Sequence, residues 1–300
     1  MIIENFLIKC YHVIVNVGFY IKKGCRMVMK YKMIASDLDG TLNDRNYIIT
    51  EGNVQAIKKA MDSGIKVVLC SGRSPVSLLF YAKKIGLDQS GCYGIGFNGG
   101  SVYEAETGKI LYETRLDRDL AVEIIKDIKN VSSDVKMSMY LEDDYIIAER
   151  DLQILEEHNN EGVMRIEKVE KLEDLSQDVI KIMLVDKRDK LDFIYNEIKD
   201  HINGRYTMVF TGQNILEFLP VNINKAEGIK RLIKHLNITL DEVVTFGDNY
   251  NDIEMIQEAG FGIAIANAVE PLKQAADYVT KRDNNDDAMI EVVDMILGID

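Results

Sequence analysis

Two carboxylates follow a short apolar segment early in the chain. Asp37 comes directly after residues 33–36, which read Met-Ile-Ala-Ser, and Asp39 stands two residues later, before Gly40 and Thr41. Side chains two residues apart on a strand share a face, although Gly40 indicates that the chain already turns here. Two carboxylates in one crevice repel each other, and aspartate and carbonyl oxygens suit Mg²⁺. The pair therefore indicates a cation site, and the alternative is an acidic turn after a strand.

A strand-to-helix turn at residues 71–73 offers donors for an anion. The apolar segment 65–70 is typical of a strand buried in a parallel sheet, and a helix is expected from about Pro75. Between them, the Ser71 hydroxyl and the Gly72 amide can donate to a phosphate, and the helix start adds a favourable dipole. Because this turn ends the second expected strand, it should lie on the same carboxyl edge of the sheet as Asp37.

Lys225 stands at the start of a helix expected over 226–236. A lysine at this position opposes the helix dipole, so the placement is locally unfavourable. A bound anion would explain it, and the alternative is one surface lysine among many.

The segment 247–252, Gly-Asp-Asn-Tyr-Asn-Asp, directly follows a mostly apolar strand expected over 242–246. Asp248, together with Asn251 and Asp252 three and four residues later, could place several oxygens around one cation. The alternative is a surface turn rich in Asp and Asn.

The pattern of elements predicts two domains. Strands alternate with helices over 31–100 and again over 214–300, which predicts a Rossmann-like α/β core with a parallel sheet. Hairpins and helices lie between, so 101–213 is predicted to be an inserted α+β domain that begins after a tight turn or hinge at 98–100. Core strands are expected over 65–70, 93–97, 215–219, 242–246, 261–265 and 278–279, with a helix capped by Thr50 and a last helix capped within 284–287. Inserted strands are expected over 101–104, 109–114, 136–141, 145–148, 180–185 and 206–210, with helices over 116–130 and 190–202.

The first thirty residues do not fit this pattern. Residues 6–21 are largely apolar, but Lys9 and His12 interrupt them, and the segment is short for a spanning helix. A secretory signal would begin with basic residues, which this start lacks. We expect residues 1–30 to be an extension outside the fold, which could arise from a start codon assigned too early. The alternatives are a membrane-surface segment or an added strand.

Composition limits the classes of partner. The 300 residues allow one large domain or two moderate ones, and the formal net charge of −13 argues against a general nucleic-acid-binding surface. A phosphorylated substrate stays possible, because a bound cation can reverse the field within one pocket. The four cysteines, at positions 10, 25, 70 and 92, have no metal-ligand spacing and no disulfide density. This favours a reduced, cytoplasmic setting, and no membrane partner is expected.

Four of these segments resemble, in order, the motifs of the haloacid dehalogenase (HAD) superfamily, chiefly Mg²⁺-dependent phosphatases with an aspartate nucleophile. Residues 37–42, Asp-Leu-Asp-Gly-Thr-Leu, resemble motif I, 71–73 motif II, Lys225 motif III and 247–252 motif IV. The inserted domain is similar in place and size to the cap of the Cof-type branch. The tail around Asn267 and Asn285-Asp286-Asp287 also resembles that branch, so the resemblance covers about 31–300.

Carried over residue by residue, the resemblance implies a role for each position. Asp37 would be the nucleophile and a Mg²⁺ ligand, and Asp39 would be the general acid and base, with its backbone carbonyl on the metal. Asp248 would complete the protein ligands with help from Asn249, and Asp252 would orient the metal shell. The residues implied to hold the phosphate are Leu38 (through its backbone), Thr41, Ser71, Gly72, Lys225 and Asn251. Ala226 and Ile265-Ala266 depart from the common family residues, which concerns the fit of the substrate rather than the catalytic side chains.

These inferences favour a Mg²⁺-dependent phosphatase that hydrolyses a small phosphorylated metabolite, such as a sugar phosphate or a nucleotide-like compound, through an aspartyl-phosphate. The alternatives are a phosphomutase or phosphotransferase, a phosphometabolite sensor without turnover, and a receiver-like phosphorylated switch. Asp39 counts against the sensor and the switch, because neither needs a proton shuttle. The large insert also disfavours a receiver, which is typically a bare doubly wound domain.

Overall fold

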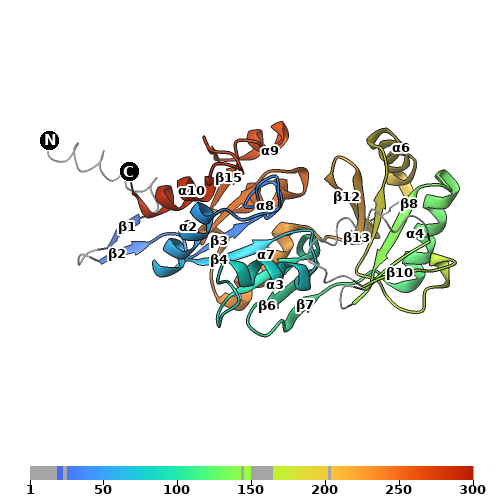
Figure 1. Cartoon of the computed structure of the whole chain (residues 1–300), viewed down its shortest axis with the longest axis horizontal. Helices are drawn as coiled ribbons and strands as arrows, with labels where there is room; N and C mark the ends of the chain where they lie inside the picture. The colour runs from blue at the N-terminus through green and yellow to red at the C-terminus, as the bar shows by residue number, and fades with distance from the viewer. Residues whose placement is uncertain (1–18, 23–25, 143–144, 150–164, 202–203, 300) are drawn as a thin grey trace. The chain divides into compact units, whose positions relative to one another are not determined.

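The computed structural model describes residues 19–22, 26–142, 145–149, 165–201 and 204–299 (Figure 1). The chain divides into two compact units. The first unit comprises the residues up to 68 together with 233–248 and 255–300, and the second unit comprises 69–232 and 249–254. Each unit therefore combines segments that lie far apart in the sequence.

Parallel strands form the sheet of the first unit. Neighbours follow the order β16 (Tyr278–Val279), β15 (Phe261–Ala264), β14 (Val243–Gly247) and β3 (Met33–Ser36). All residues of β3 and β14 are buried, as expected for strands of a parallel sheet with both faces covered. Ser36 lies opposite Phe246 in their register, so the residues that follow both strands reach the same edge of the sheet.

Amphipathic helices cover this sheet. They are α2 (Glu51–Asp62), α9 (Glu270–Ala275) and α10 (Ala288–Leu297), while α8 (Ile253–Glu258) continues a 3₁₀ turn over Tyr250–Asp252. Thr50 occupies the N-cap position of α2 as predicted, but its side chain makes no capping hydrogen bond. Its hydroxyl donates instead to the carboxylate of Asp287, which precedes α10, and α10 packs against α2. A tertiary partner has replaced the local cap.

Strand β4 (Lys66–Cys70) contains the division between the two units, since residues up to Val68 belong to the first unit and Leu69 begins the second. Leu69 and Cys70 pair in parallel with β5 (Tyr93–Gly96). The predicted hairpin is present as β6 (Ser101–Glu104) and β7 (Ile110–Glu113), and β6 is antiparallel to β5. Helices α3 (Pro75–Lys84) and α7 (Lys225–Leu236) complete this part.

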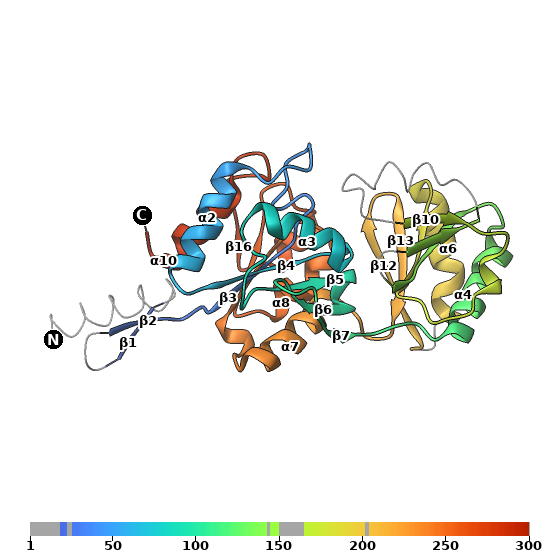
Figure 2. The same ribbon diagram turned by 60° about the horizontal axis from the view of Figure 1, so that its bottom comes forward.

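A mixed sheet of six strands forms the rest of the second unit, in the order β10-β9-β8-β11-β13-β12. The strands are β8 (Lys136–Tyr140), β9 (Tyr145–Ala148), β10 (Arg165–Lys168), β11 (Lys181–Val185), β12 (Tyr206–Gly212) and β13 (Ile215–Pro220). Helices α4 (Arg118–Val131) and α6 (Arg188–Ile198) lie on one side of this sheet in Figure 2. Their buried faces share one apolar cluster with alternate residues of the strands, among them Ile125, Leu191 and Phe218.

Strand pairing differs from two expected positions. The hairpin β6–β7, expected to open the inserted domain, extends the pairing of β5 instead. Strand β13, expected to resume the core alternation, lies between β11 and β12 in the six-stranded sheet. Strand pairing therefore places 101–113 beside β5 and 215–220 in the six-stranded sheet. The sheet that a strand joins depends on its hydrogen-bond partners, and the residues of the strand alone do not predict which strand pairs with it. The short strand β10 was not expected from the sequence.

Residues 19–29 contain a small sheet of their own. Strands β1 (Phe19–Lys22) and β2 (Arg26–Met29) pair antiparallel, with Phe19 opposite Met29. Within the described residues, these two strands form a separate two-stranded sheet and join neither of the other two sheets. An extension outside the fold stays a prediction for residues 1–30, of which 1–18 lie outside the described residues. Among the helices that the structure describes, none is long and apolar enough to cross a membrane.

Candidate active site

Backbone hydrogen bonds fix the turn that carries Asp37. Its amide donates to the carbonyl of Phe246 at 2.8 Å, which continues the parallel pairing of β3 with β14 by one residue. The carbonyl of Leu38 then accepts the amides of Leu42 and Asn43, each at 2.9 Å, so the chain turns sharply within residues 38–43. Asp37 is 5% exposed, whereas Asp39, two residues later, is only partly buried.

Gly40 is required inside this turn. Its φ is +82°, a left-handed conformation that costs a residue with a side chain roughly 1–2 kcal/mol. A Cβ at Gly40 would also stand 2.5 Å from Oδ2 of Asp248, well inside van der Waals contact. The glycine therefore lets the backbone approach the Asp248 carboxylate closely.

Asp248 comes from the end of β14, the strand that neighbours β3. The Thr41 hydroxyl, predicted to hold phosphate, donates to Oδ1 of Asp248 at 3.0 Å. The carbonyl of Asp248 accepts the amide of Val269 at 2.9 Å, which fixes the backbone after the strand. Thr41 is fully buried, so this bond orients the carboxylate within the protein.

The carboxylates of Asp37 and Asp248 form a candidate metal centre. One oxygen of each lies within 4.8 Å of the other, in a group of acidic side chains that could share a cation. Two negative charges at this distance, one of them almost buried, repel unless a cation or a proton compensates them. The donors are oxygens, which fit Mg²⁺ better than a soft metal. The residues present therefore fit the ion that the sequence predicted.

Hydrogen bonds between asparagines support the turn at residues 38–43, and most of these asparagines were not predicted as site residues. Asn43 donates to Oδ1 of Asp39 at 3.3 Å, and its carbonyl accepts from the Asn284 side chain at 2.8 Å. Asn267 donates to the carbonyl of Gly40 at 2.8 Å and accepts the amide of Asn284 at 3.1 Å. The resemblance of the tail to the Cof-type branch was the available signal for Asn267. These contacts place the C-terminal tail against the motif I turn.

In the second unit, Ser71, Gly72 and Arg73, here called the Ser-Gly-Arg turn, pack on Asn98. The backbone amide of Asn98 donates to the carbonyl of Ser71 at 3.0 Å. A Cβ at Gly72 would stand 3.1 Å from Nδ2 of the Asn98 side chain. Oδ1 of Asn98 accepts from the side chain of Asn251 at 2.9 Å. Asn98 therefore brings together two of the segments predicted to bind phosphate. Its φ of +55° and ψ of +36° are left-handed, a conformation that persists where the surroundings enforce it.

Lys225 is fully buried at the first position of α7. Its Nζ lies 2.6 Å from Oδ1 of Asp252, which is also fully buried. Oδ2 of Asp252 accepts the amide of Asn249 at 3.0 Å, and the Asn249 side chain accepts the amide of Tyr250 at 2.8 Å. The alternative of an ordinary surface lysine is therefore wrong. A carboxylate offsets its charge, and the same carboxylate holds the turn after Asp248.

Comparison with known proteins assigns the family. The family model described as haloacid dehalogenase-like hydrolase matches residues 34–293. The chain belongs to this family. A 5-amino-6-(5-phospho-D-ribitylamino)uracil phosphatase of Bacillus subtilis is 28% identical, over 89% of this chain and 98% of that protein. A haloacid dehalogenase-like hydrolase from Bacteroides thetaiotaomicron is 29% identical with a TM-score of 0.77, covering 89% of this chain and 99% of that one. A protein from Thermotoga maritima is also 29% identical, with a TM-score of 0.73 and coverages of 88% and 97%.

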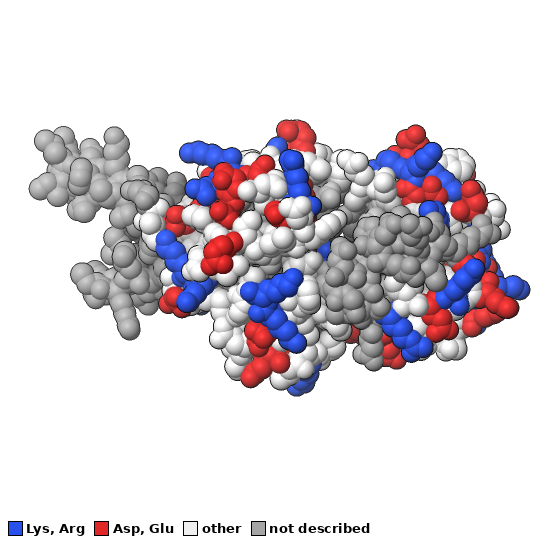
Figure 3. Space-filling model, viewed as in Figure 1, with Lys and Arg blue, Asp and Glu red and all other residues white. Residues whose placement is uncertain are grey.

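The match confirms the predicted superfamily and fold class, an α/β enzyme with a largely parallel sheet. It spans every candidate site residue, from Asp37 to Asp252. Over the face of this hydrolase seen in Figure 3, acidic and basic side chains are interspersed rather than gathered by sign. The family assignment makes the chain a hydrolase, and the roles of individual residues follow as a proposal.

Proposed function

We propose that this hydrolase is a Mg²⁺-dependent phosphatase, which acts on a small phosphorylated metabolite through an aspartyl-phosphate. The observation that carries the proposal is the placement of Asp37 and Asp248 at the ends of neighbouring parallel strands, with carboxylate oxygens within 4.8 Å of each other. A nearly buried carboxylate held beside a second one is suited both to a cation and to attack on phosphorus.

The reaction would proceed in two steps. A carboxylate oxygen of Asp37 attacks phosphorus, the bond from phosphorus to the ester oxygen breaks, and Asp39 gives its proton to the leaving alkoxide. Water then attacks phosphorus of the aspartyl-phosphate, Asp39 takes a proton from it, and inorganic phosphate leaves with the Asp37 carboxylate restored. Asp39 suits this exchange because its side chain is partly exposed, and Oδ1 of Asp39 accepts from the Asn43 side chain at 3.3 Å.

Mg²⁺ would be held by Asp37, Asp248, the Asp39 carbonyl and Asn249, and when bound it would offset charge on the transferring group. The phosphate would be held by the Leu38 backbone, Ser71, Gly72, Lys225 and Asn251. Within this scheme, Thr41 orients Asp248, and Asp252 both orients the metal shell and holds Lys225 in place.

The six-stranded layer would serve as the cap that reads the rest of the substrate. The Bacillus subtilis relative is named for a substrate that joins a phosphorylated sugar alcohol to a pyrimidine. We therefore place such compounds, with sugar phosphates and nucleotides, first in the substrate panel.

Release of inorganic phosphate tests the proposal. The protein is incubated with p-nitrophenyl phosphate and the metabolite panel, with Mg²⁺, with excess chelator, or with Ca²⁺. We expect turnover with Mg²⁺, loss of turnover in chelator and no rescue by Ca²⁺, which prefers more ligands and looser geometry. Full activity in chelator would remove the metal assignment. Transfer of the phosphoryl group to a second metabolite without phosphate release would favour a phosphotransferase instead.

A further inference from the structure

A buried ion pair in the six-stranded sheet is not used by the mechanism above. Lys181 of β11 and Glu217 of β13 lie on neighbouring antiparallel strands, and Nζ is 2.5 Å from Oε1. Both side chains are only 4% exposed. Removing two charges from water is costly, and a well-packed apolar pair often serves stability as well or better. Stability alone therefore gives little reason for a lysine and a glutamate at this place.

The other contacts of the pair lead to the candidate phosphate site within the second unit. Nζ of Lys181 donates to the carbonyl of Gly72 at 3.1 Å. The second carboxylate oxygen of Glu217 accepts from Nδ2 of Asn98 at 2.8 Å. Oδ1 of Asn98 in turn accepts from Asn251. A continuous chain of hydrogen bonds thus connects the six-stranded layer to two segments of the site.

Glu217 gives this chain a direction. A carboxylate only accepts hydrogen bonds, so it selects the orientation of the Asn98 amide in which Nδ2 faces Glu217. Oδ1 then faces Asn251, and it accepts from the amide nitrogen of that side chain. The orientation of Asn251 is thereby set by a charge two side chains away. A glutamine at 217 could present either its oxygen or its nitrogen, and this selection would be lost.

Lys181 acts on the other side of the same site. Its hydrogen bond holds the Gly72 carbonyl, and the ammonium also lies 4.4 Å from the ring centroid of Tyr140. The amide of Arg73 meanwhile donates to the Ser71 hydroxyl at 3.3 Å. The peptide planes of the Ser-Gly-Arg turn are therefore held from within and from the six-stranded layer.

We infer that Lys181 and Glu217 are positioning residues, which hold the Ser-Gly-Arg turn and the Asn251 amide in the geometry that binds a phosphate group. The inference rests on the proposed function, because it assigns phosphate binding to those segments. According to this inference, the six-stranded layer contributes to the affinity for the phosphate group itself, besides any contact that it makes with the rest of the substrate.

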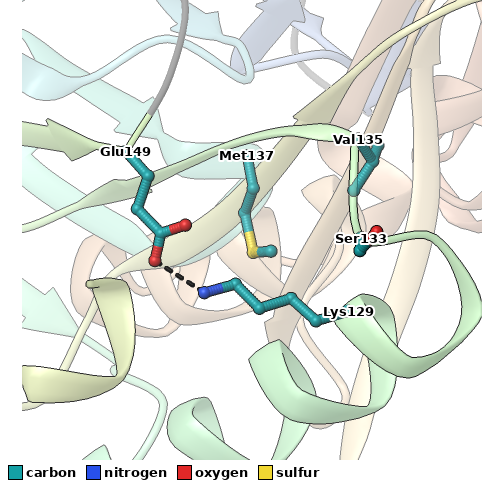
Figure 4. Close-up of a pocket in the computed structure, with 5 residues that line it drawn as sticks. All are labelled: Lys129, Ser133, Val135, Met137 and Glu149. Atoms are coloured by element: carbon teal, nitrogen blue, oxygen red, sulfur yellow. Dashed lines mark hydrogen bonds and ion pairs between the residues drawn. The ribbon is translucent and has the colours of Figure 1, made fainter. Parts of the chain in front are cut away.

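The test compares Glu217→Gln with a matched ion-pair variant of the same unit. Glu149 and Lys129 line a surface hollow with Ser133, Val135 and Met137, and their charged atoms lie 2.6 Å apart (Figure 4). Glu149 also accepts the amide of Leu172 at 2.6 Å, so Glu149→Gln perturbs an ion pair of similar length and a second accepted hydrogen bond, at a glutamate that is 17% rather than 4% exposed. Both variants should lower the melting temperature.

Glu217→Gln should also raise the inhibition constant of inorganic phosphate and lower kcat/KM for p-nitrophenyl phosphate. We expect about 10- to 100-fold, because a misplacement of about 1 Å can cost 10²-fold. In Glu149→Gln both constants should match the parent. In metal-free protein, the side-chain amide NMR signals of Asn98 and Asn251 should move in Glu217→Gln and stay in place in the control.

A lower melting temperature with parental phosphate inhibition in Glu217→Gln would overturn the inference, as would an equal rise in the control. Should Glu217→Gln fail to fold, Lys181→Met combined with Glu217→Gln leaves no unpaired buried charge and should show the same loss of phosphate affinity. A parent that neither hydrolyses phosphate esters nor binds inorganic phosphate would end the proposed function, and this inference with it. An active parent with an unaffected Glu217→Gln variant would end the inference alone.

Discussion

Replacing Lys225 by methionine separates its structural role from its proposed role on phosphate. The lysine and Asp252 are fully buried with 2.6 Å between Nζ and Oδ1, so Lys225→Met leaves a buried carboxylate without its ammonium. Breaking one side of a buried pair typically costs about 3–5 kcal/mol. For a unit of this size, 1 kcal/mol corresponds to about 2–4 °C, so we expect a melting temperature lower by about 6–20 °C.

The assay is a double-mutant cycle of Lys225→Met, Asp252→Asn and the combined variant, followed by thermal and urea unfolding in chelator. Chelator removes any stabilisation by a bound cation. The combined variant should regain much of the lost stability, because no isolated charge is then buried. The combined variant should regain no phosphatase activity when Mg²⁺ is restored, because the Lys225 ammonium proposed to bind the phosphate is absent.

Two results would refute this reasoning. A loss below about 1 kcal/mol for Lys225→Met would mean that the pair is not the buried, mutually dependent pair of the structure. A combined variant with parental activity would instead remove Lys225 from phosphate binding while leaving its structural role intact.

Further predictions concern the motif I turn and the C-terminal helix. Gly40→Ala should lose about 1–2 kcal/mol from its positive φ alone and more from the clash with Asp248, with weaker Mg²⁺ activation than in the parent; unchanged unfolding and activation would contradict the geometry. Asp39→Asn should give a burst with p-nitrophenyl phosphate and then turnover slower by about 10²–10⁴-fold, because the second step lacks its base; a steady-state rate equal to the parent would disprove that role. The Tyr278 hydroxyl donates to Glu291 at 2.6 Å, and this bond, more than burial, raises the pKa of Tyr278 to about 12. Since the folded pKa exceeds the ordinary value of 10.0, the bond stabilises the fold fully below about pH 10, and the stabilisation is lost as the pH rises towards 12. Tyr278→Phe should therefore be less stable than the parent at neutral pH and lose less on titration to pH 12, as measured by urea unfolding; equal pH dependence of the two proteins would exclude this contribution.

Local patterns in the sequence were sufficient to predict the elements that carry the site. The strands before Asp37 and Asp248 were predictable because a short, continuous apolar segment that ends in Gly or Asp is typical of a buried strand in an α/β protein. The turn at Gly40 was also predictable, because the glycine interrupts the strand pattern just after the two acids. In each case, the property depends on a few consecutive residues.

Only the tertiary structure decided which side chains meet. The burial of Lys225, its pairing with Asp252, and the place of Asn98 between the Ser-Gly-Arg turn and Asn251 all join residues far apart in the chain. The same holds for the sheet that β13 joins, because β13 could join either sheet by its own composition, and its hydrogen-bond partners placed it beside β11. Sequence periodicity reports which face of an element is buried, whereas partners depend on register and on the packing of other elements. The ion pair of Lys181 and Glu217 was for this reason invisible in the sequence: each residue is one charge in an otherwise apolar strand, and only their adjacency on neighbouring strands lets both be buried.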